Sequence, residues 1–169
     1  LQEPLITLMT ILWVVVIMNA VNMLDGLDGL AAGVCMVAAI FFAWHSYSLG
    51  QRTVPLFSLA LAGALLGFLP YNFVPARIFL GGGAYLLGYQ MTTLSILSPA
   101  KFSTVLLVLA VPIIDVAWQL VSRLRQGKSP FRGDRGHLHF RLFDQGLPTR
   151  SIVLGYYGVA LLFGLVAIL

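Results

Sequence analysis

Residues 19–29 of this chain read NAVNMLDGLDG, and they separate an apolar run at 5–21 from a second one at 30–47. The stretch carries two amides and two carboxylates at steps of three residues: Asn19, Asn22, Asp25 and Asp28. An ionised carboxylate is costly to bury in an apolar setting, so it is expected to pair, to bind a ligand or to line a wet cavity. We therefore expect a turn between two membrane helices here, with Asp25 and Asp28 serving a function.

The three-residue spacing does not place these side chains on one stripe of a helix. Each step rotates by about 300°, so the set drifts across half of the helix surface. Gly26 and Gly29 weaken a helix at this point, which predicts a helix end that presents Asp25 and Asp28 to an aqueous cleft. The alternative is a helix cap, but a cap accounts for only one of the two carboxylates.

The composition is that of an integral membrane protein. Hydrophobic residues make up 59% of the 169 positions and charged residues 9%, against about 25% in soluble domains, and the mean hydropathy is +0.93. A single cysteine, Cys35, excludes a disulfide framework and a cysteine-rich metal site within the chain. We expect an all-α, polytopic helix bundle that forms one transmembrane domain over residues 1–169, with the lipid bilayer and not a nucleic acid as its partner.

The apolar runs predict six membrane-spanning helices, each of roughly 20 residues or fewer. They cover residues 5–21, 30–47, 54–70, 84–98, 102–121 and 151–169. Alternation then puts 22–29, 71–83 and 122–150 on one face, with eight of the ten Lys and Arg residues. The excess of positive charge predicts that this face is cytoplasmic and that both chain ends face outward. Small residues such as Gly63, Gly155 and Gly158 are expected where helices pack closely.

A second polar segment on the same predicted face is PYNFVPARIFLGGG at 70–83. Its glycines would let backbone amides approach an anion, and the N-terminus of a following helix would add a favourable dipole. The alternative is a simple turn, since glycine also permits one. Arg77 could contact a phosphate, although a charge that sets topology is the favoured interpretation.

A third segment, DRGHLHFR at 134–141, lies in the basic region. Two histidines without a nearby cysteine or a third histidine do not make a closed metal site. His137, His139 and Arg135 are better suited to neutralise and hydrogen-bond a diphosphate. The alternative is that the basic cluster serves only topology and attraction to anionic lipids. Asp115 lies inside a predicted span and is expected to partner a polar group within the bundle.

Three motifs, NAVNMLDGLDGLAAG at 19–33, PARIFLG at 75–81 and HLH at 137–139, together resemble the polyprenyl-phosphate N-acetylhexosamine-1-phosphate transferases of glycosyltransferase family 4. The resemblance covers essentially the whole chain and is closer to the undecaprenyl-phosphate N-acetylglucosamine-1-phosphate branch. It implies transfer of a sugar 1-phosphate from a UDP-sugar to undecaprenyl phosphate, with release of UMP, for cell-envelope polysaccharide synthesis. It also implies a Mg²⁺ ion at the diphosphate and a multi-pass protein of the bacterial inner membrane, and it leaves a homodimer open.

The same resemblance assigns roles to individual residues. Asn22, Asp25 and Asp28 match positions that help to hold the nucleotide sugar, Asn72 matches a further amide of the site, and Phe79 matches an aromatic that stacks on uracil. His137 and His139 fall in the histidine motif near the diphosphate. We therefore expect four catalytic residues, namely Asp25, Asp28, His137 and His139. The expected substrate-binding residues are Asn19, Asn22, Asn72, Phe79, Arg77, Gly81 and Arg135.

Two departures from the family pattern concern the metal. The family has an aspartate ligand directly after the glycine that matches Gly81, but Gly82 follows here, and the family's Asp-Asp pair lies upstream of anything in this chain. The metal ligands are thus left unassigned. We expect residues 1–169 to be the C-terminal half of a longer transferase, without turnover on their own. The alternatives are a non-catalytic homologue or subunit and a membrane carrier, whose carboxylates would lie near the midplane.

Overall fold

The computed structural model describes residues 2–97, 109–125, 127 and 136–168, without the side chains of residues 2, 111, 120, 124 and 168. These residues form helices and connecting turns, with no strand among them. The helices are α1 (Gln2–Leu24), α2 (Leu30–Ser48), α3 (Thr53–Asn72), α4 (Gly83–Leu97), α6 (Ala110–Arg125), α7 (Leu138–Asp144) and α8 (Thr149–Ile168). The expectation of an all-α helix bundle is confirmed.

Four of the helices are long and apolar enough to cross a membrane: Glu3–Leu24, Leu30–Ser48, Thr53–Asn72 and Thr149–Ala167. They correspond to four of the six predicted spans. The predicted span at 84–98 falls on α4, which has only 15 residues. The predicted span at 102–121 begins outside the described residues, and α6 occupies its second part from Ala110 onward.

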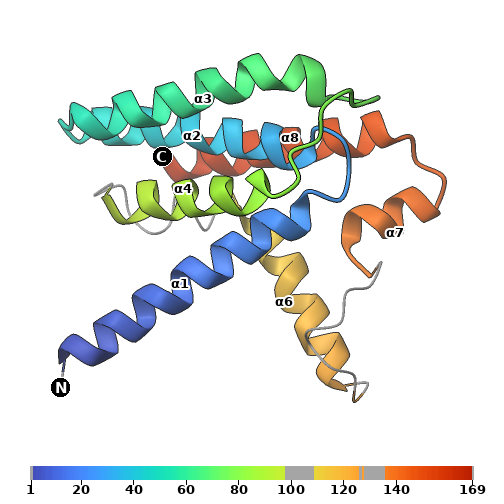
Figure 1. The fold of residues 1–169 in the computed structure, drawn as a ribbon, viewed down its shortest axis with the longest axis horizontal. Helices are drawn as coiled ribbons and strands as arrows, with labels where there is room; N and C mark the ends of the chain where they lie inside the picture. The colour runs from blue at the N-terminus through green and yellow to red at the C-terminus, as the bar shows by residue number, and fades with distance from the viewer. Residues whose placement is uncertain (1, 98–108, 126, 128–135, 169) are drawn as a thin grey trace.

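Helix α2 is the centre of the bundle. It packs on both α3 and α8, while α1 packs on α4 (Figure 1). Of its span, 72% is buried, compared with 17–28% for the other three candidate spans. The exposed residues of α1, α3 and α8 include many large aliphatic side chains, such as Leu5, Leu56 and Leu162. A core helix surrounded by outward-facing apolar helices is the arrangement expected of a bundle in lipid.

Close helix contacts do rely on glycine, but not at the positions expected from the sequence. A Cβ atom at Gly33 would collide with the Tyr157 side chain, and one at Gly88 would lie 2.7 Å from the Cα atom of Met18. By contrast, a Cβ atom at Gly63, Gly155 or Gly158 would meet nothing within 4 Å. These three glycines face away from the described neighbouring helices, whereas Ala62, in the same run of small residues as Gly63, is buried in the core.

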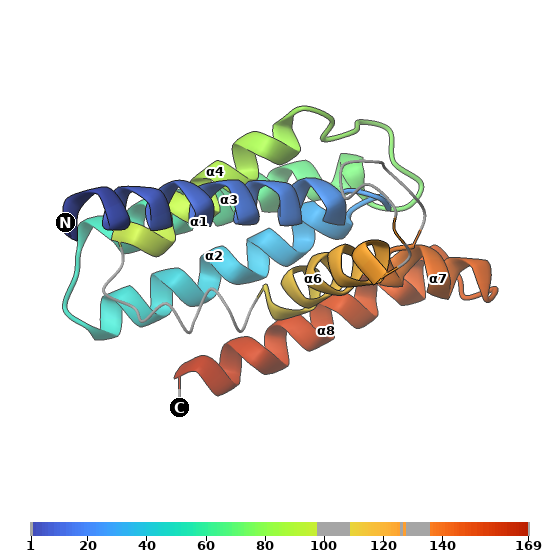
Figure 2. The ribbon, with the colours of Figure 1, turned by 90° about the horizontal axis from the view of Figure 1, so that it is seen from below.

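The chain reversals that carry the polar motifs gather at one end of the bundle. Figures 1 and 2 both show the turns after α1 and α3 and the helix α7 at this end, with the α2–α3 turn and both termini toward the other. Helix α8 contacts two of these turns: the Arg150 side chain donates hydrogen bonds to the Val74 carbonyl, and the Tyr157 hydroxyl donates one to the Gly29 carbonyl. The expectation that the three polar segments share a face is confirmed; which side of the membrane this face occupies stays a prediction.

Candidate active site

A pocket of about 190 Å³ opens at this end of the bundle between the α1–α2 turn and the segment after α3. Helix α1 stops at Leu24, directly before the Asp-Gly pair, as the glycine positions predicted. Gly29 adopts φ +80, a left-handed conformation that glycine tolerates, and α2 begins at the next residue. The pocket is lined by Asp25, Gly26, Leu27, Asp28, Asn72, Phe79 and Leu80.

Two hydrogen bonds from the bundle hold the 73–82 segment in place. Asp28 Oδ2 accepts a hydrogen bond of 2.9 Å from the backbone N–H of Ala76. The Asn72 side chain, which is 2% exposed, donates a hydrogen bond of 3.0 Å from Nδ2 to the Ile78 carbonyl. Asn72 Oδ1 is buried and has no hydrogen-bond partner among the described residues. Both side chains therefore shape the wall of the pocket before any ligand enters.

Asp25 has an electrostatic environment that differs from that of a surface carboxylate. Burial, and next the neighbouring Asp28 carboxylate, raise its pKa from 3.8 to about 6, and a backbone hydrogen bond from Gly81 partly offsets this rise. Asp25 lies next to a second carboxylate in a partly desolvated pocket. A cation or a hydrogen-bond donor that enters the pocket would therefore stabilise its ionised form. Gly81 thus reaches the site through its backbone, as the glycine run suggested.

Phe79 lies at the mouth of the pocket with 72% of its surface exposed. A large aromatic ring that stays exposed to water loses the free energy that burial of its apolar faces would contribute. In this position the ring offers a face on which a flat, aromatic ligand group can stack.

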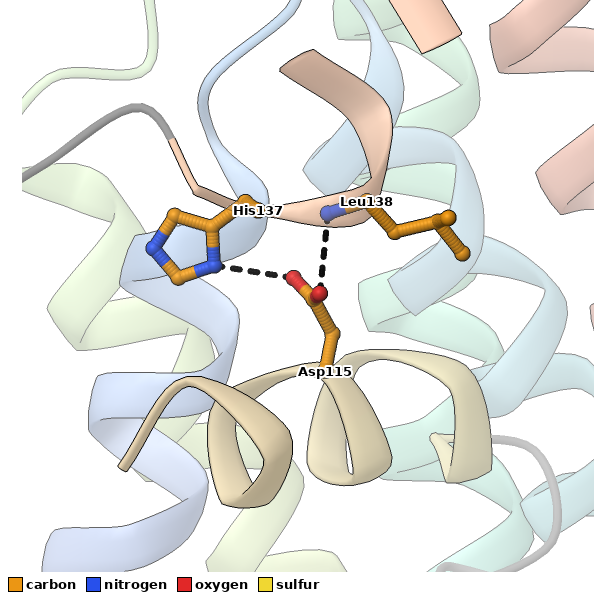
Figure 3. A network of polar contacts seen from close by, with 3 residues as sticks. All are labelled: Asp115, His137 and Leu138. Carbon is orange, nitrogen blue, oxygen red and sulfur yellow. Dashed lines mark hydrogen bonds and ion pairs between the residues drawn. The ribbon is translucent and has the colours of Figure 1, made fainter. Parts of the chain in front are cut away.

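The histidine segment is anchored by Asp115 of α6. Asp115 Oδ2 lies 2.8 Å from His137 Nδ1, and Asp115 Oδ1 accepts a hydrogen bond of 2.8 Å from the backbone N–H of Leu138 (Figure 3). The sequence indicated only that Asp115 would partner some polar group; its partner is the histidine motif. The spacing of 22 residues between Asp115 and His137 carries no periodicity from which this pairing could be found.

His139 is buried rather than open to the pocket. It is 1% exposed, both of its ring nitrogens lack a hydrogen-bond partner among the described residues, and its ring packs directly on Gly26. Burial, together with His137, lowers its pKa from 6.5 to about 4, so the ring is neutral at pH 7. His137 and His139 stack with parallel rings whose centroids are 5.6 Å apart. His139 thus connects the histidine segment to the pocket turn.

The other residues expected at the site lie apart from the pocket lining. Asn19 donates its side-chain hydrogen bond to the Val15 carbonyl within α1, Asn22 is half-buried near the end of α1, and Arg77 is exposed. Arg135 lies outside the described residues. Leu80 lines the pocket and the backbone N–H of Ala76 supports its wall. Both lie in the PARIFLG motif, but the sequence assigned them no role, because an apolar side chain and a backbone N–H are not distinctive chemical groups.

A metal site does not follow from the residues described. Over 2–97, 109–125 and 136–168, no group of three or more His, Cys, Asp or Glu side chains is placed to hold a metal ion. At the position after Gly81, where the family pattern has a carboxylate, Gly82 faces open space. The two carboxylates of the pocket alone do not make a closed Mg²⁺ site.

The fold and the pocket together define a helical membrane protein with a polar site at one end of its bundle. The family model described as glycosyl transferase family 4 matches residues 1–99, which include the whole pocket lining. The chain therefore belongs to glycosyl transferase family 4.

Individual relatives agree with this placement. The chain is 39% identical over 167 residues to a probable undecaprenyl-phosphate N-acetylglucosaminyl 1-phosphate transferase of Bacillus subtilis, covering 95% of this chain and 47% of that protein. It is 37% identical to a decaprenyl-phosphate N-acetylglucosaminephosphotransferase of Mycobacterium tuberculosis, covering 75% of this chain and 36% of that one. It is also 37% identical to a phospho-N-acetylmuramoyl-pentapeptide-transferase of Moorella thermoacetica, covering 80% of this chain and 43% of that protein. The chain spans less than half the length of these relatives.

Proposed function

We propose that the protein containing this chain transfers N-acetylglucosamine 1-phosphate from UDP-N-acetylglucosamine to undecaprenyl phosphate and releases UMP. The observation that carries the proposal is the pocket itself, where Asp25 and Asp28 meet Asn72 and Phe79 from a different part of the chain. The names of the relatives support a polyprenyl-phosphate acceptor and a sugar-phosphate donor. The finer choice of N-acetylglucosamine rests on the B. subtilis and M. tuberculosis relatives.

The pocket residues suit the parts of a nucleotide sugar. The exposed Phe79 ring can stack on the uracil base, and the carboxylates of Asp25 and Asp28 can accept hydrogen bonds from hydroxyl groups. Phosphoryl transfer depends mainly on positioning and on neutralising charge. We infer that the described pocket holds and orients the donor. The magnesium ion that the family resemblance implies is also part of the proposal, but no set of ligands for it is found among the described residues.

The site end of the bundle is proposed to face the cytoplasm of a bacterial cell, where a soluble UDP-sugar is available. This follows from the distribution of Lys and Arg, eight of which lie in the segments assigned to that face. Membrane helices with their polar turns at one rim give the soluble donor and the lipid acceptor access to the same place.

A transfer assay with two donors tests both the reaction and the sugar. Membranes containing the natural protein that includes residues 1–169 are incubated with undecaprenyl phosphate and either UDP-N-acetylglucosamine or UDP-N-acetylmuramoyl-pentapeptide, and lipid product and UMP are measured. We expect equal amounts of UMP and lipid-linked sugar with the first donor only. Product with the second donor only would place the protein in the muramoyl-pentapeptide branch, and no product with either would refute the transferase.

The same membranes separate the transferase from the alternatives. A carrier would accumulate unmodified UDP-sugar inside sealed vesicles, and a non-catalytic homologue would bind the donor without releasing UMP. The carboxylates favour the transferase, since Asp25 and Asp28 follow the end of α1 instead of lying mid-helix, where a carrier's coupling site is expected. Residues 1–169 alone are expected to bind donor without turnover, and release of UMP by that purified fragment would contradict this expectation.

A further inference from the structure

Asp115 uses its two carboxylate oxygens for two different donors. Oδ2 meets the Nδ1 atom of His137, and Oδ1 receives the backbone N–H of Leu138, both at 2.8 Å. The side chains of His137 and Asp115 are only 9% and 10% exposed. A hydrogen bond that involves an ionised carboxylate and is shielded from water is among the stronger ones in proteins.

The geometry fixes which nitrogen of the neutral imidazole carries the hydrogen. An ionised carboxylate can only accept hydrogen bonds, so the Nδ1 atom of His137 must carry a hydrogen. In the neutral ring, Nε2 then holds the lone pair, and Figure 3 shows this nitrogen on the side of the ring away from Asp115. In this neutral tautomer Nε2 accepts hydrogen bonds and does not donate them.

The pair is also connected to the pocket. The His137 ring stacks in parallel on the His139 ring, and His139 packs on Gly26, which lines the pocket. Asp115 therefore orients the His137 ring, and a single intervening residue, His139, links that ring to the pocket turn.

We propose that Asp115 is a positioning residue of the transfer site, which holds His137 as the Nδ1–H tautomer and keeps Nε2 free to accept a hydrogen bond or a proton from the phosphate or hydroxyl group of a bound substrate. The proposal rests on the proposed transferase function. Asp115 itself touches no substrate in this account and acts only through His137.

Asp115→Asn is the sharpest variant, because it keeps the shape and removes one acceptor. The amide has one oxygen and one NH₂ group, and the backbone N–H of Leu138, which cannot become an acceptor, requires the oxygen. The NH₂ group is then left facing His137 Nδ1, which must present its lone pair, so the tautomer switches to Nε2–H. Asp115→Glu keeps two acceptor oxygens and is the conservative partner. Asp144→Asn, an exposed carboxylate at the end of α7, is the matched control.

The first measurement is independent of activity. In the natural protein containing this chain, labelled with ¹⁵N-histidine and solubilised, the imidazole ¹⁵N signals of His137 are assigned by comparison with His137→Ala. We expect protonated Nδ1 in the wild type, in Asp144→Asn and in Asp115→Glu, and protonated Nε2 in Asp115→Asn. Protonated Nε2 in the wild type, or an unchanged tautomer in Asp115→Asn, would overturn the proposal.

The second measurement is a double-mutant comparison of kcat and KM for sugar-phosphate transfer. We expect Asp115→Asn to lower kcat by about 10²–10⁴-fold, the range for a positioned proton acceptor, with little change in KM. Asp115→Glu is expected to recover part of the loss, and Asp115→Asn is expected to cost nothing further in a His137→Ala background. Additive losses would mean that Asp115 acts through the fold alone and would overturn the proposal. A wild type that shows the expected tautomer but no transfer from either donor would refute the proposed function, and this inference with it. Only the hydrogen-bond geometry would then remain.

Discussion

The carboxylate of Asp28 and the backbone N–H of Ala76, which are 48 residues apart in the chain, form a hydrogen bond of 2.9 Å. This contact fastens the segment after α3 over the turn that follows α1, and the pocket is enclosed by these two segments. Asp28 thus builds the wall of the site in addition to any role toward a ligand.

Removing that carboxylate is expected to loosen the pocket. A hydrogen bond to a charged group contributes about 1.5–3 kcal/mol, so Asp28→Ala should lower the midpoint of thermal unfolding in detergent and weaken donor binding together. Asp144→Ala, which removes an exposed carboxylate, is the control. If Asp28→Ala abolishes donor binding while the unfolding midpoint stays unchanged, Asp28 is a ligand contact and its bond to Ala76 has no structural importance.

Gly26 is expected to be intolerant of a side chain. A Cβ atom there would collide with the His139 ring and lie 2.9 Å from the Phe140 ring, so Gly26→Ala must push α7 away from the pocket turn. Overpacking of this kind costs about 1–3 kcal/mol. We expect a lower unfolding midpoint and reduced transfer activity.

Gly63→Ala is the matched control for this change, since a Cβ atom there meets nothing within 4 Å. In a helix, alanine is favoured over glycine by about 1 kcal/mol, so this variant should be as stable as the wild type or slightly more stable. Equal behaviour of the two variants would mean that the packing of His139 on Gly26 does not constrain the site.

Asp25 should make stability depend on pH in a defined direction. Its pKa rises from 3.8 to about 6 on folding, so between these values the folded protein holds a proton that the unfolded chain has lost. The free energy of unfolding attributable to Asp25 therefore falls as the pH rises through this window. In Asp25→Asn this loss is absent.

The unfolding midpoint of Asp25→Asn should equal that of the wild type near pH 4 and exceed it increasingly up to about pH 6 to 7. His139, whose pKa falls to about 4, works in the opposite sense, because protonation of the unfolded chain lowers stability below about pH 6.5. This contribution cancels when the two proteins are compared at each pH. A constant difference across the range would show that Asp25 titrates as an ordinary carboxyl.

Phe79 is expected to serve binding and not folding. Stacking of a base on an aromatic side chain contributes about 1–3 kcal/mol, so Phe79→Ala should raise the Kd for UDP by roughly 5- to 150-fold in calorimetry. Because the ring is 72% exposed, the unfolding midpoint should hardly change. Ile78→Ala, at a neighbouring residue that is 50% exposed, is the control and should bind UDP normally. Equal Kd values for the wild type, Phe79→Ala and Ile78→Ala would show that Phe79 does not stack on uracil.

The two ends of the bundle should lie on opposite sides of the membrane. Ser48→Cys places a thiol near the α2–α3 turn and Gln145→Cys places one after α7, both at exposed positions, while the native Cys35 is buried. In intact cells a membrane-impermeant maleimide should label Ser48→Cys, and Gln145→Cys should react only after the membrane is opened. The reverse pattern would invert the predicted orientation.

The sequence predicted the parts of the molecule that depend on local pattern. The end of α1 before Asp25 and Gly26 follows from helix propensity, and four spans follow from the length of the apolar runs. The placement of Asn72 and Phe79 beside the carboxylates came from the resemblance to the family.

Contacts between distant segments could not be predicted in this way. The hydrogen bonds from Ala76 to Asp28 and from Arg150 to Val74 each join a side chain to a backbone group. Because backbone groups are the same in nearly every residue, the sequence does not indicate which one is the partner. The burial of His139 was missed because a histidine beside arginines is typical of an exposed basic segment. The glycines at helix contacts, Gly33 and Gly88, were missed because helix rotation, which is set by tertiary packing, decides which glycine faces a neighbour.

The fate of the β-phosphate tests the central claim most directly. The natural protein that contains this chain is supplied with undecaprenyl phosphate and UDP-N-acetylglucosamine carrying ³²P in the β-phosphate, and the lipid and aqueous products are separated. Transfer of a sugar 1-phosphate predicts that the label moves into the lipid fraction while unlabelled UMP is released, and that Asp25→Ala abolishes both. Label that remains in UDP while the sugar reaches the lipid, or label that never leaves the donor, would contradict the account.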